Sequence, residues 1–241
     1  MKNGKKLKYE KLIGQYIEND SHLKENVISI YAMGSFVKNE EFNDIDINIF
    51  CNENSYMFIR KIKDMQEYFI ATHDISIDVN AIDSCMYADG FLFNDMFIHR
   101  NRHSLLLFEL KTLNYKIYGE DILMDMKFDR HSLKKEALKL ALTVRHRLSK
   151  KYFMEINHDG HSSFIRKNVK YAIEFFLVFY DVENPYYCTA EEFISSFPQF
   201  MEYEKLITIA LGRDPNYCVT YENAYDFIVD LSKNMKRAYV A

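Results

Sequence analysis

The chain has 241 residues, of which 48% are hydrophobic and 27% charged, and this composition excludes a disordered or collagen-like protein. The length favours two small domains, and 7 Gly and 3 Pro are too few for an all-β protein rich in tight turns, so helices should dominate. The formal net charge is 31 − 35 = −4, which does not provide the overall positive field of a general nucleic-acid coat protein.

The first half of the chain alternates between helical and strand-like patterns. Apolar residues recur at helical spacing over residues 7–18. Two strands, 27–33 and 44–50, are predicted next, joined by a short turn, because the first is rich in β-formers and the second alternates strictly between polar and apolar residues. Residues 55–70 return to the helical period, and residues 75–82 alternate again. We therefore predict the order strand, strand, helix, strand after a leading helix.

The end of this first part has a weaker pattern. Residues 96–99 resemble a short strand, residues 105–113 a helix, and residues 115–118 a strand that stops at Gly119. The charged segment 99–103 is either a phosphate contact or a solvated loop. We place the end of an α/β domain at residue 119.

The second half of the chain has only helical patterns. Residues 132–148 carry the apolar stripe of an amphipathic helix, and residues 163–182 form a more apolar one. The segment Thr189–Glu192 is a T-x-x-E capping box, which opens a third helix. Two more helices are predicted at about 200–211 and 221–239.

Neither the cysteines nor the apolar segments indicate a secreted or membrane protein. The four cysteines are at least 30 residues apart and form no C-x-x-C pair, so we expect free thiols rather than a zinc site or disulfides. The first twenty residues lack the apolar core of a secretory signal. The most apolar run, 171–180, is half the length needed to span a bilayer. We therefore expect a cytosolic protein.

The segment that carries chemistry runs from Gly34 to Asp46. Asp44 and Asp46 share one face of the predicted strand, because successive side chains of a strand point to opposite faces. Two carboxylates held that close repel each other unless a cation lies between them, and Mg²⁺ suits oxygen ligands. Asp78 is polar in the same way on a later strand, which could place it beside the pair. Gly34 and Ser35 follow a strand directly and offer backbone N–H groups and a hydroxyl to a phosphate.

This order of elements resembles the DNA polymerase beta-like nucleotidyltransferases. The matching residues are Gly34, Ser35, Asp44, Asp46 and Asp78. With a helical part behind this motif, the chain looks like the small aminoglycoside and lincosamide nucleotidyltransferases. The resemblance implies an α+β fold, with a nucleotidyltransferase α/β core built on a mixed sheet at residues 1–119 and a helical, substrate-binding bundle at residues 120–241. A plain turn followed by the solvent face of an edge strand is the structural alternative.

The resemblance also implies a reaction and roles for the five residues. A nucleoside monophosphate, AMP from ATP, would pass to a hydroxyl of a small molecule, with an aminoglycoside-type antibiotic as acceptor, which is an antibiotic-resistance activity. Asp44 and Asp46 would hold Mg²⁺, one of two ions, on the triphosphate. Gly34 and Ser35 would bind the terminal phosphates. Asp78 would either ligate the second ion or take the proton of the attacking hydroxyl.

Residues 171–204 are the second informative segment. They contain seven acidic and eleven aromatic residues and no basic one. Carboxylates beside aromatic rings bind cationic ligands through ion pairs and cation–π contacts, so Tyr171 and Glu174 are candidate contacts of a cationic acceptor. A core helix with ordinary caps explains the same residues, and both interpretations stay open.

Two rival functions follow from other features. Residues 130–151 contain eight Lys and Arg residues, which form either a solvated helix face or a contact with a nucleotide or RNA. A toxin–antitoxin-type nucleotidyltransferase that modifies tRNA or a protein would use such a surface. The second rival is a catalytically degenerate binding module.

Overall fold

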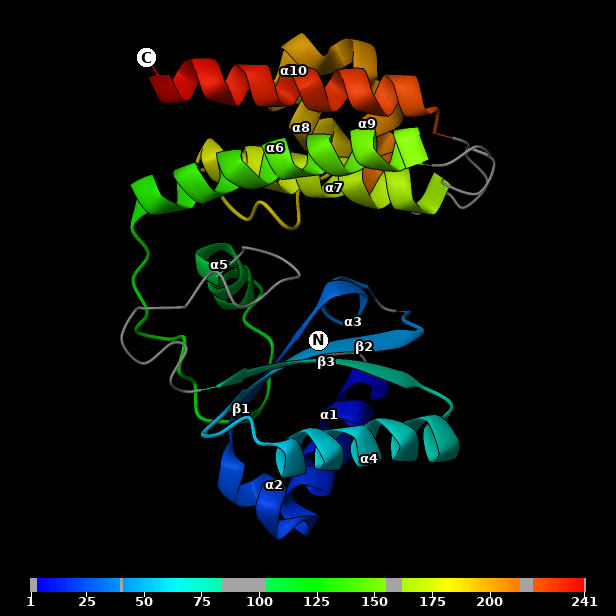
Figure 1. Ribbon diagram of the computed structural model, residues 1–241, viewed down its shortest axis with the longest axis vertical. Helices are drawn as coiled ribbons and strands as arrows, with labels where there is room; N and C mark the ends of the chain where they lie inside the picture. The colour runs from blue at the N-terminus through cyan, green and yellow to red at the C-terminus, as the bar shows by residue number, and fades with distance from the viewer. Residues whose placement is uncertain (1–3, 40, 84–102, 155–161, 213–218, 241) are drawn as a thin grey trace. The chain divides into compact units, whose positions relative to one another are not determined.

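The structure, a computed structural model, describes residues 4–39, 41–83, 103–154, 162–212 and 219–240 (Figure 1). The chain forms two compact units, residues 1–127 and 128–241. The first contains a four-stranded mixed sheet with helices, and the described part of the second is helical. The predicted α+β class with a mixed sheet is confirmed.

The first unit is built around this sheet. Its elements are α1 (Gly4–Asn19), α2 (Ser21–Asn26), β1 (Val27–Met33), α3 (Gly34–Lys38), β2 (Asp44–Cys51), α4 (Tyr56–His73), β3 (Ser76–Asp83), α5 (His103–Leu113) and β4 (Lys116–Gly119). The strand order is β3-β2-β1-β4, with β1 antiparallel to β2 and β4 and with β2 parallel to β3. α4 provides the crossover that a parallel pair requires.

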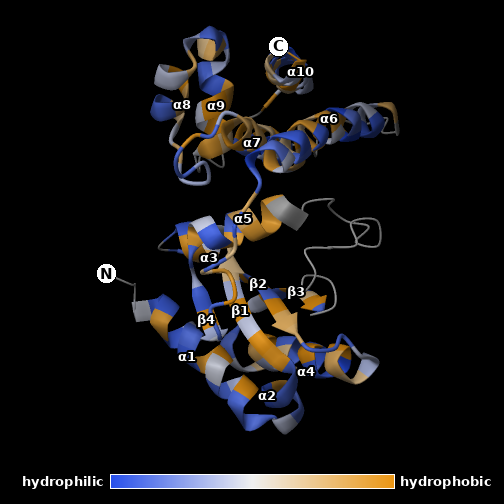
Figure 2. Ribbon diagram, turned by 90° about the vertical axis from the view of Figure 1, so that its left-hand side faces the viewer, coloured by the Kyte–Doolittle hydropathy of each residue, from blue (hydrophilic) through white to orange (hydrophobic). Residues whose placement is uncertain are grey.

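The sheet has an apolar face and a polar face at β2 and β3. Ile45, Ile47 and Ile77 are at most 1% exposed, and they alternate with polar residues along the two strands. Met65 and Phe69 of α4 are fully buried as well. α1, α2 and α4 lie on one side of the sheet, and α5 lies on the other (Figure 2). Burial of each such side chain contributes roughly 1.5–3 kcal/mol, and this fixes which way the strand residues point.

Two short helices in the first unit were not predicted. Asp20 accepts hydrogen bonds from the N–H groups of His22 and Leu23 at 3.0 and 3.1 Å and so begins α2, where the sequence indicated a polar break. α3 occupies the connection from β1 to β2, where we predicted a short turn. The predicted strand 96–99 and the charged segment 99–103 lie outside the residues with described side chains.

The second unit packs its helices around an aromatic core. Its elements are α6 (Arg130–Met154), α7 (Ser162–Phe179), α8 (Ala190–Ser196), the 3₁₀ helix η2 (Pro198–Tyr203), α9 (Glu204–Leu211) and α10 (Tyr221–Val240). Phe176, Phe193, Phe200 and Phe227 lie with ring centroids 5.4–6.5 Å apart along the contacts that join α7, α8, η2 and α10. The capping box predicted at Thr189 is confirmed. The helix predicted over residues 200–211 is a 3₁₀ helix first and an α-helix only from residue 204.

The division between the units falls at residues 127 and 128, eight residues after Gly119. Side chains of the first unit hold the intervening segment. The Tyr31 hydroxyl donates to Asp121 at 2.9 Å, and the Lys111 ammonium donates to the carbonyls of Met124 and Met126 at 2.7 Å each. These contacts join residues distant in sequence, which is why the strand pattern ending at Gly119 does not mark the division.

No described helix is long and apolar enough to cross a membrane. Cys51 is buried and Cys188 is half-buried, and both are free thiols. The other two cysteines, Cys85 and Cys218, lie outside the described residues.

Candidate active site

The polar face of the sheet brings Asp44, Asp46 and Asp78 together. Asp44 and Asp46 are two residues apart on β2, so both side chains are on the face opposite Ile45 and Ile47. β3 is parallel to β2 and in register with it over eight residue pairs, and Asp46 pairs with Asp78. Asp44 and Asp78 are exposed, and Asp46 is half-buried. Three carboxylates on neighbouring positions therefore create a strongly negative patch that water can reach.

Gly34 and Ser35 lie directly beside this patch. β1 ends at Met33, which pairs with Asp46 across the antiparallel ladder, so the next two residues begin α3 next to the carboxylates. The Ser35 hydroxyl donates to the Asp44 carboxylate at 3.2 Å. Gly34 has φ +66°, and a Cβ atom there would overlap the Asp46 carboxylate. Only glycine combines this left-handed backbone with so close an approach.

The donors at this patch fit magnesium. All three side chains offer carboxylate oxygens, and Mg²⁺ uses one or two carboxylates together with water and substrate phosphates. Within the described parts of the chain, no three His, Cys, Asp or Glu side chains are gathered into a preassembled metal site. Carboxylates that share a face without a cation repel each other, so an open arrangement of their side chains is expected before Mg²⁺ and a triphosphate bind.

Two asparagines that sequence reasoning missed continue the same face. Asn48 follows Asp46 on β2 and is 1% exposed, whereas Asn80 follows Asp78 on β3 and is exposed. The two are paired in the strand register, and the Asn80 amide donates to the Asn48 carbonyl oxygen at 2.9 Å. The alternation with a period of two that predicted the faces of Asp46 and Asp78 continues to Asn48 and Asn80. The sequence therefore contained a signal that these two side chains lie on the same face.

The two predicted acceptor contacts lie on α7 in the second unit. Glu174 is 4% exposed. Tyr171 is half-buried and stacks on Phe175 at 6.3 Å, and the Lys167 ammonium lies 5.8 Å from the Tyr171 ring centroid. Lys167 therefore already occupies a cation position beside this ring.

The basic segment 130–151 lies in helix α6, and its cations differ in their environments. Arg130 and Lys134 pair with Asp181 of the connection after α7, at 3.3 and 2.6 Å. Lys135 and Lys139 instead line a surface hollow of about 480 Å³. The lining of that hollow, all from α6, is Lys135, Leu138, Lys139, Leu142, Thr143 and His146.

Comparison with known proteins supports the fold. No family model and no curated protein sequence matches the chain. Among solved structures, the spectinomycin adenyltransferase AAD(9) from Enterococcus faecialis, determined with ATP and spectinomycin, is similar with a TM-score of 0.59 and 16% identity. The match covers 95% of this chain and 99% of that chain. The chain thus has the fold of a small antibiotic nucleotidyltransferase over almost its whole length, as the motif in residues 27–82 predicted.

Proposed function

We propose that this protein is an adenylyltransferase that moves AMP from ATP to a hydroxyl group of a small molecule, with an aminoglycoside-type antibiotic as acceptor. One observation carries the proposal: the Gly34–Ser35 turn lies against Asp44 and Asp46, with Asp78 opposite Asp46 on the parallel neighbour. The structural neighbour, which has this fold, was determined with ATP and spectinomycin.

Asp44 and Asp46 are the residues that would hold Mg²⁺, and Asp78 offers a further carboxylate within the same patch. When bound there, Mg²⁺ neutralises negative charge that develops on the leaving pyrophosphate. Two ions are expected by analogy with other phosphoryl-transfer sites that use a pair of metals. Asp46 is half-buried, and partial burial strengthens the attraction of its carboxylate for a cation. This position fits a ligand that both ions share.

The chain's own groups bind and orient the triphosphate. The Ser35 hydroxyl, which donates to Asp44 in this structure, would donate to a terminal phosphate oxygen once Asp44 is engaged with the cation. Gly34 leaves space for the phosphate chain beside Asp46, where any side chain would intrude.

The acceptor hydroxyl attacks the α-phosphorus, a new O–P bond forms and pyrophosphate leaves with its bonding electron pair. The proton of that hydroxyl needs a base, and the exposed Asp78 carboxylate is available for it. Asp78 can act as this base or as a ligand of the second ion. The two roles separate experimentally, because loss of a base changes the pH profile of kcat, whereas loss of a ligand changes the Mg²⁺ concentration that the enzyme requires.

The helical unit is proposed to hold the acceptor. The segment that runs from the end of α7 to α9 carries five exposed carboxylates, a negative charge that suits a cationic antibiotic: Glu183, Glu191, Glu192, Glu202 and Glu204. Tyr171 and Glu174 stay proposed contacts. Glu174→Gln keeps the shape and removes the charge, so a contact residue would lose affinity for the acceptor with little loss of stability.

The test is mass spectrometry after incubation with ATP and Mg²⁺. Spectinomycin, streptomycin, kanamycin, a lincosamide, tRNA and the protein itself are offered in parallel. We expect one antibiotic to gain the mass of one AMP unit, and Asp46→Asn to abolish the gain. A panel in which nothing is modified, despite ATP binding, would instead indicate a binding module.

A toxin–antitoxin-type activity on tRNA is the second candidate. It is favoured by the face of α6 that carries Lys135, Lys139, His146 and Lys150, all exposed. If tRNA gains the mass of one AMP unit in the same experiment and the antibiotics do not, this function is established in place of the first. Binding of tRNA should then weaken steeply with salt.

A further inference from the structure

The polar face of β2 and β3 continues beyond the three carboxylates as a hydrogen-bonded pair of asparagines. The Asn80 side-chain N–H donates to Asn48 Oδ1 at 2.9 Å, and the Asn48 side-chain N–H donates to the Met33 sulfur at 3.1 Å. Met33 is the residue immediately before Gly34, so this chain of contacts runs from β3 across β2 to the start of the phosphate-side turn.

The sulfur determines how both amides are oriented. A thioether has no hydrogen to donate and only accepts, so the NH₂ group of Asn48 must face Met33 and its carbonyl oxygen must face Asn80. The NH₂ group of Asn80 must then face Asn48, which leaves the Asn80 carbonyl oxygen directed away from the pair. No described residue donates a hydrogen bond to that oxygen. Asn48 is buried, so its side chain is shielded from solvent. Asn80 is exposed, so its carbonyl oxygen lies on the solvent-accessible part of the polar face, next to the candidate site.

Asn80 is also close to Asp78, which has been placed at the acceptor hydroxyl. Residues i and i+2 of a strand are about 7 Å apart and point to the same face. A single bound molecule can therefore contact both side chains.

We infer that Asn80 binds the acceptor, and that the group it recognises is a hydrogen-bond donor of the acceptor, a hydroxyl or an ammonium. This inference rests on the proposed function. The hydroxyl that receives AMP lies at Asp78, and a second hydroxyl or an ammonium of the same molecule donates to the Asn80 carbonyl oxygen. Asn48 is a positioning residue, since it holds the Asn80 amide in the one orientation that presents this oxygen.

The experiment compares KM for the acceptor with KM for ATP in variants of β3. The probes are spectinomycin, streptomycin, kanamycin B and tobramycin, with the transfer measured at saturating Mg²⁺. Asn80→Ala should raise KM about tenfold for the acceptor that the wild type uses, the loss expected for one hydrogen bond, with KM for ATP within twofold. Ser76→Ala is the matched control, because Ser76 is exposed on the same face two residues before Asp78. Its effect on the acceptor KM should stay within twofold.

A second variant tests the orientation of the amide. Asn48→Leu removes both hydrogen bonds of the buried position, leaves Asn80 in place and should raise the acceptor KM by about three- to fivefold without changing KM for ATP. The melting temperature of each variant is measured alongside, so that loss of folding is distinguished from loss of binding. A rise in acceptor KM that is absent in Ser76→Ala and independent of the melting temperature is the expected signature.

Three outcomes would overturn the inference. The first is an acceptor KM for Asn80→Ala within twofold of wild type, and the second is an equal rise in KM for ATP. The third is a wild-type protein that binds MgATP by calorimetry but neither binds nor modifies any probe, which rejects Asn80 as a contact of these acceptors and leaves nucleotide binding intact. A protein that does not bind MgATP at all would reject the proposed function itself, and the inference with it.

Discussion

Gly34 and Asp46 are in such close contact that a single added carbon atom at position 34 would overlap the Asp46 carboxylate. The two residues belong to different elements, since Gly34 begins α3 and Asp46 lies within β2. The turn at Gly34 and the carboxylates of β2 are thus in direct contact, so a change at either one disturbs the other.

Gly34→Ala is therefore expected to reduce both stability and nucleotide binding. Alanine at φ +66° costs about 1–2 kcal/mol in backbone strain, and its methyl group displaces the Asp46 carboxylate. Calorimetric titration should show MgATP affinity reduced by about tenfold or more, which is at least 1.4 kcal/mol. Gly14→Ala is the control, because its Cβ would meet only the Tyr118 ring at 3.8 Å, and it should stabilise α1 by about 0.5–1 kcal/mol. Unchanged MgATP affinity in Gly34→Ala would show that the turn is only structural.

Asp46→Asn should abolish transfer without destabilising the metal-free protein. The substitution removes one of three negative charges that share a face, so the melting temperature in EDTA should equal or exceed that of the wild type. The kcat should fall by about 10³-fold or more, because the cation loses its half-buried ligand. Asp74→Asn is a matched control, since Asp74 caps α4 in the left-handed region, which Asn also tolerates. Substantial activity remaining in Asp46→Asn would remove this residue from the mechanism.

The first unit should lose stability in acid partly through Asp20. The hydrogen bond from Lys61 at 2.8 Å, together with those from the backbone of Leu23 and His22, holds the pKa of the Asp20 carboxyl below its ordinary value of 3.8. Because the folded pKa is the lower one, this contribution is present above about pH 4 and is lost as the pH falls through the folded pKa. Asp20→Ala should cost about 1 kcal/mol at pH 7 by urea unfolding, and the difference from wild type should shrink towards pH 3. A difference that does not change with pH would contradict this role.

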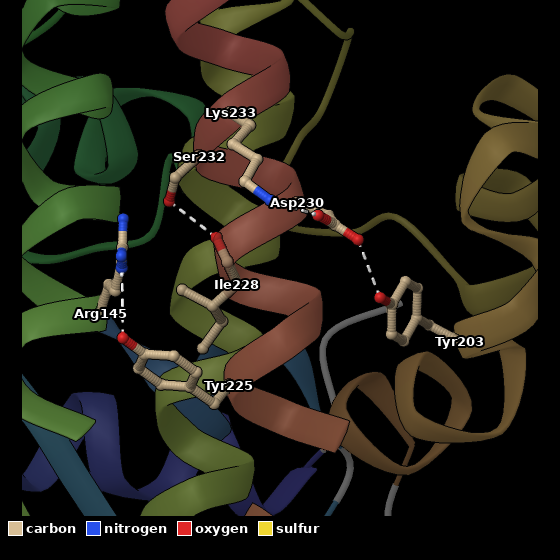
Figure 3. Close-up of polar contacts among 7 residues, drawn as sticks. All are labelled: Arg145, Tyr203, Tyr225, Ile228, Asp230, Ser232 and Lys233. Atoms are coloured by element: carbon tan, nitrogen blue, oxygen red, sulfur yellow. Dashed lines mark hydrogen bonds and ion pairs between the residues drawn. The ribbon is translucent and has the colours of Figure 1, made fainter. Parts of the chain in front are cut away.

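The contact between Tyr203 and Asp230 should stabilise the helical unit and make it sensitive to alkali (Figure 3). The Tyr203 hydroxyl donates to the Asp230 carboxylate at 2.9 Å, and burial and then this hydrogen bond raise the pKa of Tyr203 above its ordinary value of 10.0. The unfolded phenol ionises first, so the stabilisation is complete below about pH 10 and declines as the pH rises further. Tyr203→Phe should cost about 1 kcal/mol at pH 7 and reduce the alkaline decline. Tyr56→Phe, at a side chain 81% exposed, should change neither quantity.

The strands and their faces were predictable because a period of two gives both location and orientation. The segment from Asp44 to Phe50 and the predicted strand 75–82 show this pattern, and the structure has both strands within one or two residues. The pairing of Asp46 with Asp78 was not determined by the pattern, since register between strands is a non-local property. For the same reason the pairing of Asn48 with Asn80 was missed.

The unpredicted features are short or depend on tertiary contacts. α2 has six residues and buries only Leu23 and Asn26, which is too short for a helical period to be visible. Its signal was the N-cap Asp20, which the sequence alone does not distinguish from a turn. For Glu174 the sequence gives two equal interpretations, and its low exposure of 4% does not decide between a core residue and a contact of a bound acceptor.

The in-register pairing of β2 with β3 has a consequence for insertions and deletions. One residue inserted near the start of β3 would turn Asp78 towards α4 and an isoleucine towards the phosphates, whereas one residue added to the Asn52–Ser55 connection would leave every pair unchanged. The arrangement of the proposed site therefore depends on strand alignment as well as on the identity of a few side chains. A chain built in this way can differ from a structural neighbour at five positions in six and still align with it from end to end.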